Sequence, residues 1–303
     1  MLSITLGLGI ENAYATLPDC VGVDKPGLKN NEMYVGDSVS NLNKVDANDG
    51  HSCVVGTMLS GTTPILCTDV ALDPTTSPET LYCVTFTDLY KINRSTTAAT
   101  FVGNLKNGII FETNVNAMEI DSAGKAYVAD IDGNLYNLNL SNGALTLRSN
   151  LGHPSAGDLA WDVYTGKMYW TSQTCSGAEC SGADDGLWLI DLTTNIATAV
   201  KSTNFDSVFA ADFLPGEHTM HFVTFAGDLF ELKEDGTFVD SGVTFPLVHA
   251  FGGTANQLLV GGINVALNTT ALLIAGIQSN AAWLTPGVLA GIALVAFTFR
   301  KKI

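Results

Sequence analysis

Five segments of this 303-residue chain repeat one pattern, and this repeat limits the possible folds more than any other feature. Each segment opens with a polar residue and a leucine, continues as an alternating strand, and turns into a second strand. The leucines lie 47, 46, 52 and 42 residues apart, at Leu42, Leu89, Leu135, Leu187 and Leu229. A period of this length predicts stacked copies of one supersecondary unit.

Further apolar strands lie upstream of these leucines. Every repeat has one: EMYVG from Glu32, LYCVTF from Leu81, KAYVAD from Lys125, KMYWTS from Lys167 and MHFVTF from Met220. Four repeats have another, which ends in Asp73, Asp121, Asp162 or Asp212. Four antiparallel strands in about 45 residues make one blade of a β-propeller. Only 15% of the residues are charged, which is too few for long amphipathic helices, so we expect an all-β domain.

The number of blades follows from what the repeats leave over. The first repeat lacks its leading strand, and FPLVHAF (Phe245–Phe251) remains after the fifth. We expect this strand to join the N-terminal three and close a ring of five blades. Six blades, with NQLLVGG starting another, and an open β-solenoid are the alternatives. Residues 30–255 resemble the general β-propeller family, and the resemblance implies a fold but no particular activity.

Both ends of the chain have features of an exported protein. Residues 1–15 combine an apolar stretch with Ala13 and Ala15 in an A-x-A pattern, as at the end of a signal peptide, although an N-terminal strand is the alternative. Near the C-terminus, residues 281–299 are uncharged and are followed by Arg300 and two lysines. As a helix, this stretch would be about 28 Å long, close to the thickness of a bilayer core, and its basic end would stay in the cytoplasm.

The tail also resembles C-terminal anchors of prokaryotic, especially archaeal, cell-surface proteins. We therefore expect a single-pass protein of the cell membrane, with its ectodomain outside and its C-terminus in the cytoplasm. The predicted parts are a signal-peptide remnant (1–15), a propeller ectodomain (16–262), a linker (263–280) and a transmembrane helix with a short basic end (281–303).

The cysteines and sequons fit the same compartment. Six cysteines in an exported chain predict disulfides. Cys175 and Cys180 flank four residues, which favours a short local bridge. For the other four we expect Cys20–Cys53 and Cys67–Cys83, while other pairings stay open. The sequons that could carry glycans are Asn93, Asn139 and Asn268.

Three aspartates are the best candidates for a ligand or cation site. Asp69, Asp158 and Asp206 precede the innermost strands of three blades, so their carboxylates could converge at one mouth of the axial channel. Carboxylates in a confined space either bind a cation such as calcium or acquire raised pKa values. Solvated loop aspartates are the alternative. We assign no catalytic residue and expect no cofactor other than this possible calcium.

Other motifs have simpler interpretations. Leu159–Trp170 resembles the tryptophan-docking repeat of quinone-dependent dehydrogenases, but the equivalent positions of other repeats hold Cys83, Val128 and Phe222. We therefore expect Trp170 to pack between blades. Asp46–Gly50 and Asp130–Asn134 look like pieces of calcium loops, but neither reaches the distal glutamate that such loops need. Their Asp and Gly residues favour turns.

The composition narrows the function. A net charge of −16 repels nucleic acid. The sequence has no H-E-x-x-H, G-x-S-x-G, P-loop or dinucleotide motif. Our first hypothesis is a membrane-anchored extracellular propeller that binds a glycan or protein partner, in adhesion or envelope assembly, without catalysis. The alternatives are a carbohydrate-active hydrolase or lyase that uses the three aspartates, and a structural coat protein.

Overall fold

The computed structural model describes residues 18–20, 27–112, 114–174, 185–203, 207–215, 219–233, 237–247, 249–255 and 257. These residues belong to one compact unit, Met1–Leu258. Among them, no helix has the length and apolar character needed to cross a membrane. The predicted signal peptide (1–15), linker (263–280) and transmembrane segment (281–303) lie outside the described residues.

The structure has five blades, numbered here 1 to 5, and each is built from four antiparallel strands, which are named below from the innermost to the outermost. In blade 3, two more strands extend the sheet. Blade 1 is β24 (Ala250–Ala255), β1 (Glu32–Asp37), β2 (Asn41–Asp46) and β3 (Ser52–Thr57). Blade 2 is β6 (Asp69–Asp73), β7 (Thr80–Val84), β8 (Asp88–Ile92) and β9 (Ala99–Asn104). Blade 3 is β12 (Val115–Ile120), β13 (Ala126–Asp130), β14 (Asn134–Leu138) and β15 (Ala144–Asn150). Blade 4 is β16 (Ser155–Asp162), β17 (Lys167–Ser172), β18 (Gly186–Asp191) and β19 (Ile196–Ser202). Blade 5 is β20 (Val208–Phe213), β21 (Met220–Thr224), β22 (Asp228–Leu232) and β23 (Phe238–Thr244).

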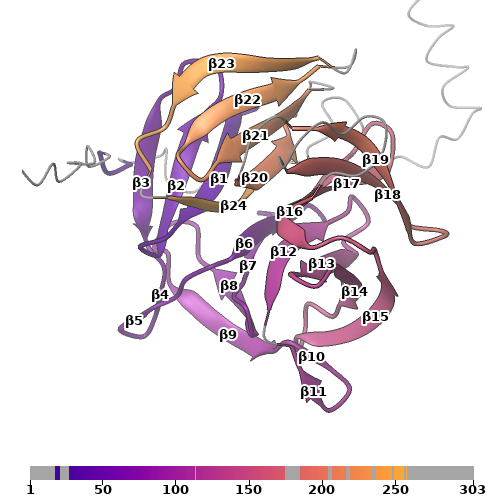
Figure 1. The fold of residues 1–303 in the computed structure, drawn as a ribbon. Helices are drawn as coiled ribbons and strands as arrows, with labels where there is room; N and C mark the ends of the chain where they lie inside the picture. The colour runs from indigo at the N-terminus through magenta and orange to yellow at the C-terminus, as the bar shows by residue number, and fades with distance from the viewer. Residues whose placement is uncertain are drawn as a thin grey trace, which may run out of the picture. The chain divides into compact units, whose positions relative to one another are not determined.

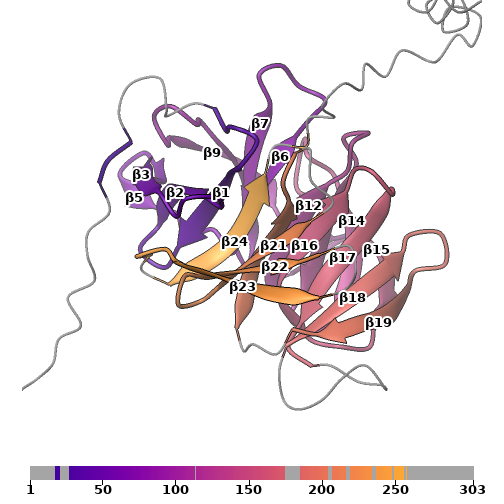
Figure 2. The ribbon, with the colours of Figure 1, turned by 90° about the horizontal axis from the view of Figure 1, so that it is seen from above.

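The innermost strands β24, β6, β12, β16 and β20 pack against one another in a closed ring (Figure 1). The described chain is therefore a five-bladed β-propeller, as predicted, and the six-blade and open-solenoid alternatives are wrong. Two short hairpins, β4 (Leu59–Ser60) with β5 (Thr63–Pro64) and β10 (Lys106–Asn107) with β11 (Ile110–Phe111), lie in the connections between blades. Figure 2 shows the propeller from the side, with β24 beside β1.

The closing strand differs from the predicted one. It is β24, which starts at Ala250 and pairs with β1, whereas we expected a strand over Phe245–Phe251. Phe245 and Leu247 are buried between blades 5 and 1 instead. The backbone then changes direction at His249, which has a φ of 59°. The predicted residues thus lead into the closing strand and fill an apolar space before it.

The core lies between neighbouring blades and not within any one of them. The five leucines that mark the repeats are fully buried, with exposed fractions of 0%. Five apolar clusters each combine residues of adjacent blades, around the whole ring. Trp170 belongs to the cluster between blades 3 and 4, which confirms its predicted packing role. A single blade would leave both of its apolar faces in water, so the blades stabilise one another.

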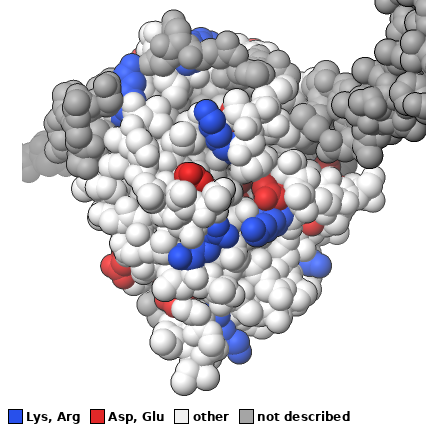
Figure 3. Space-filling model, turned by 90° about the vertical axis from the view of Figure 1, so that its right-hand side faces the viewer, with Lys and Arg blue, Asp and Glu red and all other residues white. Residues whose placement is uncertain are grey.

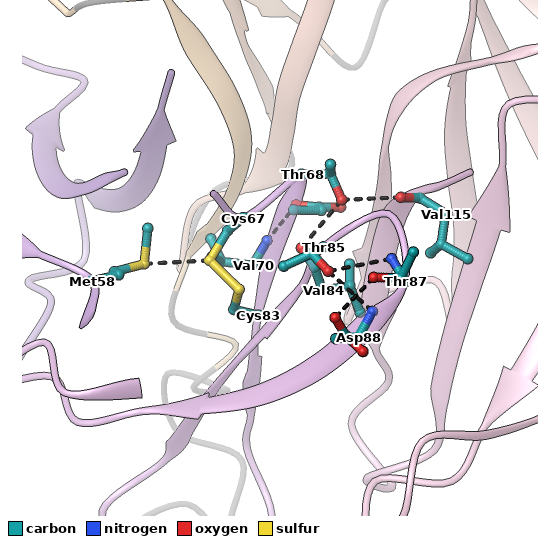
Figure 4. Close-up of a disulfide and its surroundings, with 11 residues drawn as sticks. Met58, Cys67, Thr68, Val70, Cys83, Val84, Thr85, Thr87, Asp88 and Val115 are labelled. Carbon is teal, nitrogen blue, oxygen red and sulfur yellow. Dashed lines mark hydrogen bonds between the residues drawn. A yellow bond between two sulfur atoms is a disulfide. The ribbon is translucent and has the colours of Figure 1, made fainter. Parts of the chain in front are cut away.

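Two disulfides match the expected pairs. Cys20–Cys53 joins a segment near the N-terminus to β3, and Cys67–Cys83 joins the chain just before β6 to β7. Near the second bridge, the Thr68 hydroxyl donates to the backbone oxygens of Val84 and Val115, which links blades 2 and 3 (Figure 4). The predicted pair Cys175–Cys180 lies outside the described residues.

Candidate functional site

Four acidic side chains lie along the axis of the ring, on four different innermost strands. They are Asp69 on β6, Glu119 on β12, Asp158 on β16 and Asp212 on β20, and each has an exposed fraction of 0%. We call them the axial acids. Two were predicted, Asp69 and Asp158, and the structure brings both into the axis. The third predicted residue, Asp206, lies outside the described residues.

Glu119 and Asp212 were not among the predicted site residues. Both stand in the short apolar strands AMEID and VFAAD, where an acid is otherwise unusual. An acid one residue before the end of each of these two leading strands, β12 and β20, was the signal that could have identified them. Because alternate residues of a strand point to opposite faces, one face of each leading strand must point into the axis.

Three of the axial acids, Asp69, Asp158 and Asp212, accept hydrogen bonds from backbone amides of other blades. Asp69 Oδ2 accepts a 2.5 Å hydrogen bond from the Met118 amide, and Asp212 Oδ2 accepts one of 2.6 Å from the Ala255 amide. Asp158 Oδ2 accepts from Ala211 at 2.6 Å and from Gly253 at 3.2 Å. Each of these bonds crosses from one innermost strand to another, so the carboxyls hold blades together. Glu119 accepts instead from the Ile120 amide of its own strand and from the Gln257 side chain.

The two remaining junctions of the ring have bonds of the same kind. The Asn116 amide group on β12 donates to the Ser155 backbone oxygen on β16 at 3.2 Å. The Leu72 amide on β6 donates to the Thr254 hydroxyl on β24 at 3.3 Å. Every junction between neighbouring innermost strands therefore has a bond from a side chain to a backbone group. Buried backbone groups without a partner would be costly, and these side chains satisfy them.

Glycine permits the close approach that this arrangement needs. Gly252 on β24 has a φ of 45°, and a Cβ atom there would lie 2.3 Å from the Asp69 Cα. A real Cβ cannot come so close to a backbone atom, so only glycine fits without a shift of the strand. Gly252 thereby fixes the distance between β24 and β6.

The axis favours the protonated form of its acids. Burial raises the pKa of Asp212 to about 7, and it raises those of Asp69, Asp158 and Glu119 well above their ordinary values. Repulsion by Asp69 adds to the effect of burial at Asp158. Asp158 Oδ1 and Glu119 Oε2 have no hydrogen-bond partner among the described residues, which fits carboxyls that keep a proton there.

These acids are poorly placed to bind metal or substrate. No group of three or more His, Cys, Asp or Glu within the described ranges has the arrangement of a metal site. The calcium site at Asp69, Asp158 and Asp206 therefore stays a prediction. Because Asp69 and Asp158 are fully buried and already accept backbone bonds, a substrate outside the ring does not reach them.

Aromatic side chains gather at the end of the ring where the innermost strands begin. We call this end the upstream end. Phe225 stacks on His249 with ring centroids 4.1 Å apart, and Phe209 and Phe251 lie within 5.9 Å of Phe225. These four rings, all half-buried, form an aromatic group at the upstream end.

Large apolar side chains are exposed in connections at the same end. They lie in loops of blades 1, 2 and 3 and in the connection that leads to β6. Their exposed fractions are 50% for Val39, 38% for Leu66, 45% for Phe86 and 36% for Ile131. Single exposed apolar residues are common on proteins, but several at one end are typical of a contact surface. We call these four residues the upstream apolar set.

Charge is dispersed on the side of the molecule that Figure 3 shows. Uncharged residues cover most of the described surface in this view, and basic groups near its middle lie beside acidic ones. This part of the described surface presents no large patch of one sign, of the kind that binds a polyanion.

The other predicted sites are local turns. Asp46 and Asp130 each accept backbone hydrogen bonds within their own turn, and Gly50 and Gly133 there have φ values of 73° and 79°. The turn interpretation is confirmed. Among the sequons, Asn93 and Asn139 lie exposed in the turns β8–β9 and β14–β15, while Asn268 lies outside the described residues. Whether they carry glycans stays a prediction.

Comparisons with known proteins do not assign this chain to a family. No protein-family profile and no curated protein matches the sequence. Among solved structures, a chain of a nidogen/laminin complex has a TM-score of 0.47 and 10% identity, over 74% of this chain and 97% of that one. An extracellular domain from B. thetaiotaomicron has a TM-score of 0.38 and 15% identity, over 71% of this chain and 26% of that one. The five-blade assignment rests on the strand pairing described above.

Proposed function

We propose that this protein is a membrane-anchored extracellular propeller that acts as a non-enzymatic binding module for a protein or glycan partner. The observation that carries the proposal is the upstream apolar set: four large apolar side chains exposed in separate connections at one end of the ring. Burial of such side chains against a partner is the main source of free energy in protein association.

The location follows from features of the sequence. The signal-like residues 1–15 and the uncharged stretch 281–299 with its basic end support export and anchoring. The two disulfides also favour an oxidising compartment. Intact cells provide the test of this part. We expect added protease to remove the propeller without lysis, and a chain that is cleaved only after lysis would overturn it.

Binding is tested with matched surface variants. We expect a Phe86→Ser, Ile131→Ser double variant to bind envelope proteins or a glycan array at least several-fold more weakly, because both side chains leave water on binding. Ile196→Ser is the control, since Ile196 is 60% exposed at the start of β19, on another blade. If both variants bind as the unchanged protein does, the upstream end is not the binding surface.

The carbohydrate-active alternative is weaker, because two of the three carboxyls that it needs, those of Asp69 and Asp158, are buried. It can be tested directly by turnover of polysaccharides. An activity that the unchanged protein has and that Asp158→Asn abolishes would favour the enzyme over the binding module. We expect no turnover by either chain, and equal binding by both.

A further inference from the structure

The two most exposed large apolar side chains of the described residues lie beside a third at the tip of one hairpin. Ile109, Ile110 and Phe111 have exposed fractions of 94%, 63% and 60%. Lys106 and Asn107 of β10 pair with Phe111 and Ile110 of β11, and Gly108 and Ile109 make the turn between them. We call this hairpin, Lys106–Phe111, the apolar hairpin. Three adjacent side chains of this kind in water indicate a surface that is covered in use.

The apolar hairpin is a built element of the fold. β10 pairs in parallel with β15, so the sheet of blade 3 extends by two strands beyond its fourth. At the base, the Leu105 amide donates to the Thr87 backbone oxygen at 2.7 Å, and the Leu105 side chain is fully buried. Figure 1 shows β11 beyond the outer strands of the ring, at its lower edge. The base therefore holds the apolar tip away from the core.

The chemistry of the tip fits a lipid surface. Lys106 Nζ lies 5.9 Å from the centre of the Phe111 ring, so a cation stands directly behind the apolar residues. In membrane-surface elements, apolar side chains enter the boundary of the acyl chains while lysine reaches back to the headgroups. The net charge of −16 gives no long-range attraction to anionic lipid, so insertion would depend on the apolar tip itself.

The length of chain beyond the propeller makes this contact possible. Residues 258–280 separate the last described residue from the uncharged stretch, and 23 extended residues reach roughly 75 Å. A propeller of this size has a diameter of roughly 45 Å. Although the chain leaves β24 at the end of the ring opposite to the base of the hairpin, the tether is long enough for the edge of blade 3 to meet the bilayer.

We infer that the apolar hairpin inserts Ile109, Ile110 and Phe111 into the outer leaflet of the membrane that anchors the chain. This inference rests on the proposed anchoring. It gives the propeller a second contact with the membrane, which sets its orientation.

Fluorescence quenching by lipid tests the contact. The full chain is placed in zwitterionic phosphatidylcholine vesicles with brominated acyl chains. Trp283 is first changed to Phe because it lies in the predicted span. In that background we compare Ile109→Trp with the control Ile196→Trp, whose position on blade 4 is also well exposed. The background keeps Trp161, Trp170 and Trp188, so its emission is subtracted from that of each variant. We expect the bromines to reduce the emission that Ile109→Trp adds roughly twofold, since insertion brings this tryptophan to their depth, and to leave the emission that Ile196→Trp adds unchanged.

Two outcomes overturn the inference in different ways. If the chain stays with the vesicles after alkaline carbonate washing but both tryptophans are quenched equally, the hairpin does not enter lipid. A protein partner for the tip is then the remaining explanation. If the chain is washed off the vesicles, the anchoring proposal fails, and the inference fails with it. Circular dichroism of each variant confirms that its fold is unchanged, as expected for substitutions at exposed positions.

Discussion

The aspartates of this propeller do two different things, according to where the strand places them. In the outer turns, a side chain binds amides two to four residues ahead: Asp191 accepts from Thr193 at 2.7 Å and from Thr194 at 3.2 Å. In the axis, Asp158 and Asp212 accept from residues 43 to 95 positions away. The turn aspartates shape one hairpin each, whereas the axial ones join blades.

The two groups also respond to acid in opposite ways. Backbone amides hold the pKa of Asp191 below its ordinary value, and burial raises that of Asp212 to about 7. Charge is therefore the stable form at Asp191, and the proton is the stable form in the axis. The same residue type thus supports local structure when ionised and the closed ring when neutral.

The largest effect that we expect comes from adding a side chain at Gly252, where β24 closely approaches β6. Gly252→Ala places a Cβ 2.3 Å from the Asp69 Cα, so β24 must shift and the free energy of unfolding should fall by about 3–5 kcal/mol. Gly242→Ala is the matched control, with a φ of 69° but no atom within 4 Å of its Cβ. It should cost only the backbone strain of about 1–2 kcal/mol. Equal losses in urea unfolding would show that the axial contact is unimportant.

Removal of an axial carboxyl should have the next largest effect. Asp158→Ala leaves the amides of Ala211 and Gly253 buried without an acceptor, which should cost about 2–4 kcal/mol of unfolding free energy. Asp158→Asn keeps an acceptor oxygen in the same place and should cost within about 1 kcal/mol near neutral pH. Chemical denaturation of both variants measures the difference. An alanine variant as stable as the asparagine variant would mean that the carboxyl does not join the blades.

Raising the pH should weaken the ring. The pKa of Asp212 is about 7 in the folded state, against about 3.9 in an unfolded chain, so the folded state binds the proton more tightly. This contribution is complete below pH about 4 and disappears as the pH rises to about 7. Its slope is at most about 1.4 kcal/mol per pH unit. Unfolding free energies from pH 4 to 8 should fall more steeply for the unchanged protein than for Asp212→Asn; parallel curves would contradict the buried proton.

The smallest effect should come from the turns. Asp191→Ala removes two amide acceptors that water can replace, because the carboxyl is exposed. We expect its unfolding midpoint to move less than that of any axial variant. Since the pKa of Asp191 is lowered in the folded state, its small contribution is present above pH about 4 and is lost on acidification. A loss as large as that of Asp158→Ala would remove the distinction between the two groups.

Local patterns were enough to predict most of the fold. The period of the leucines and the alternation of the strands depend on nearby residues, and they indicated the blades. Asp-Gly turns such as that at Gly133 are equally local. The position of β24 was not predictable in this way, because it depends on a partner strand more than 200 residues away, β1. Phe245 and Leu247 look like strand residues, but their burial between blades decided their place.

The candidate site was predicted in part for the same reason. Asp69 and Asp158 stood out because each comes at the start of a predicted strand, DVALD or DLAWD. Glu119 and Asp212 lie inside strands, and only the closed ring shows that their side chains meet in the axis. The partners of the carboxyls are backbone amides of other blades, and amides have no signature in a sequence.

The placement of β24 also has a mechanical consequence. The chain continues from this strand toward the uncharged C-terminal stretch, so any pull from that side reaches β24 before the rest of the propeller. β24 runs antiparallel to β1 over the register from Met33↔Ala255 to Asp37↔Ala250. A force along the strand therefore loads all of these hydrogen bonds in shear at the same time. It also loads the hydrogen bonds that the Gly253 and Ala255 amides donate to Asp158 and Asp212. The strand that completes the ring, β24, is thus also the strand that resists mechanical unfolding of the propeller from its C-terminal side.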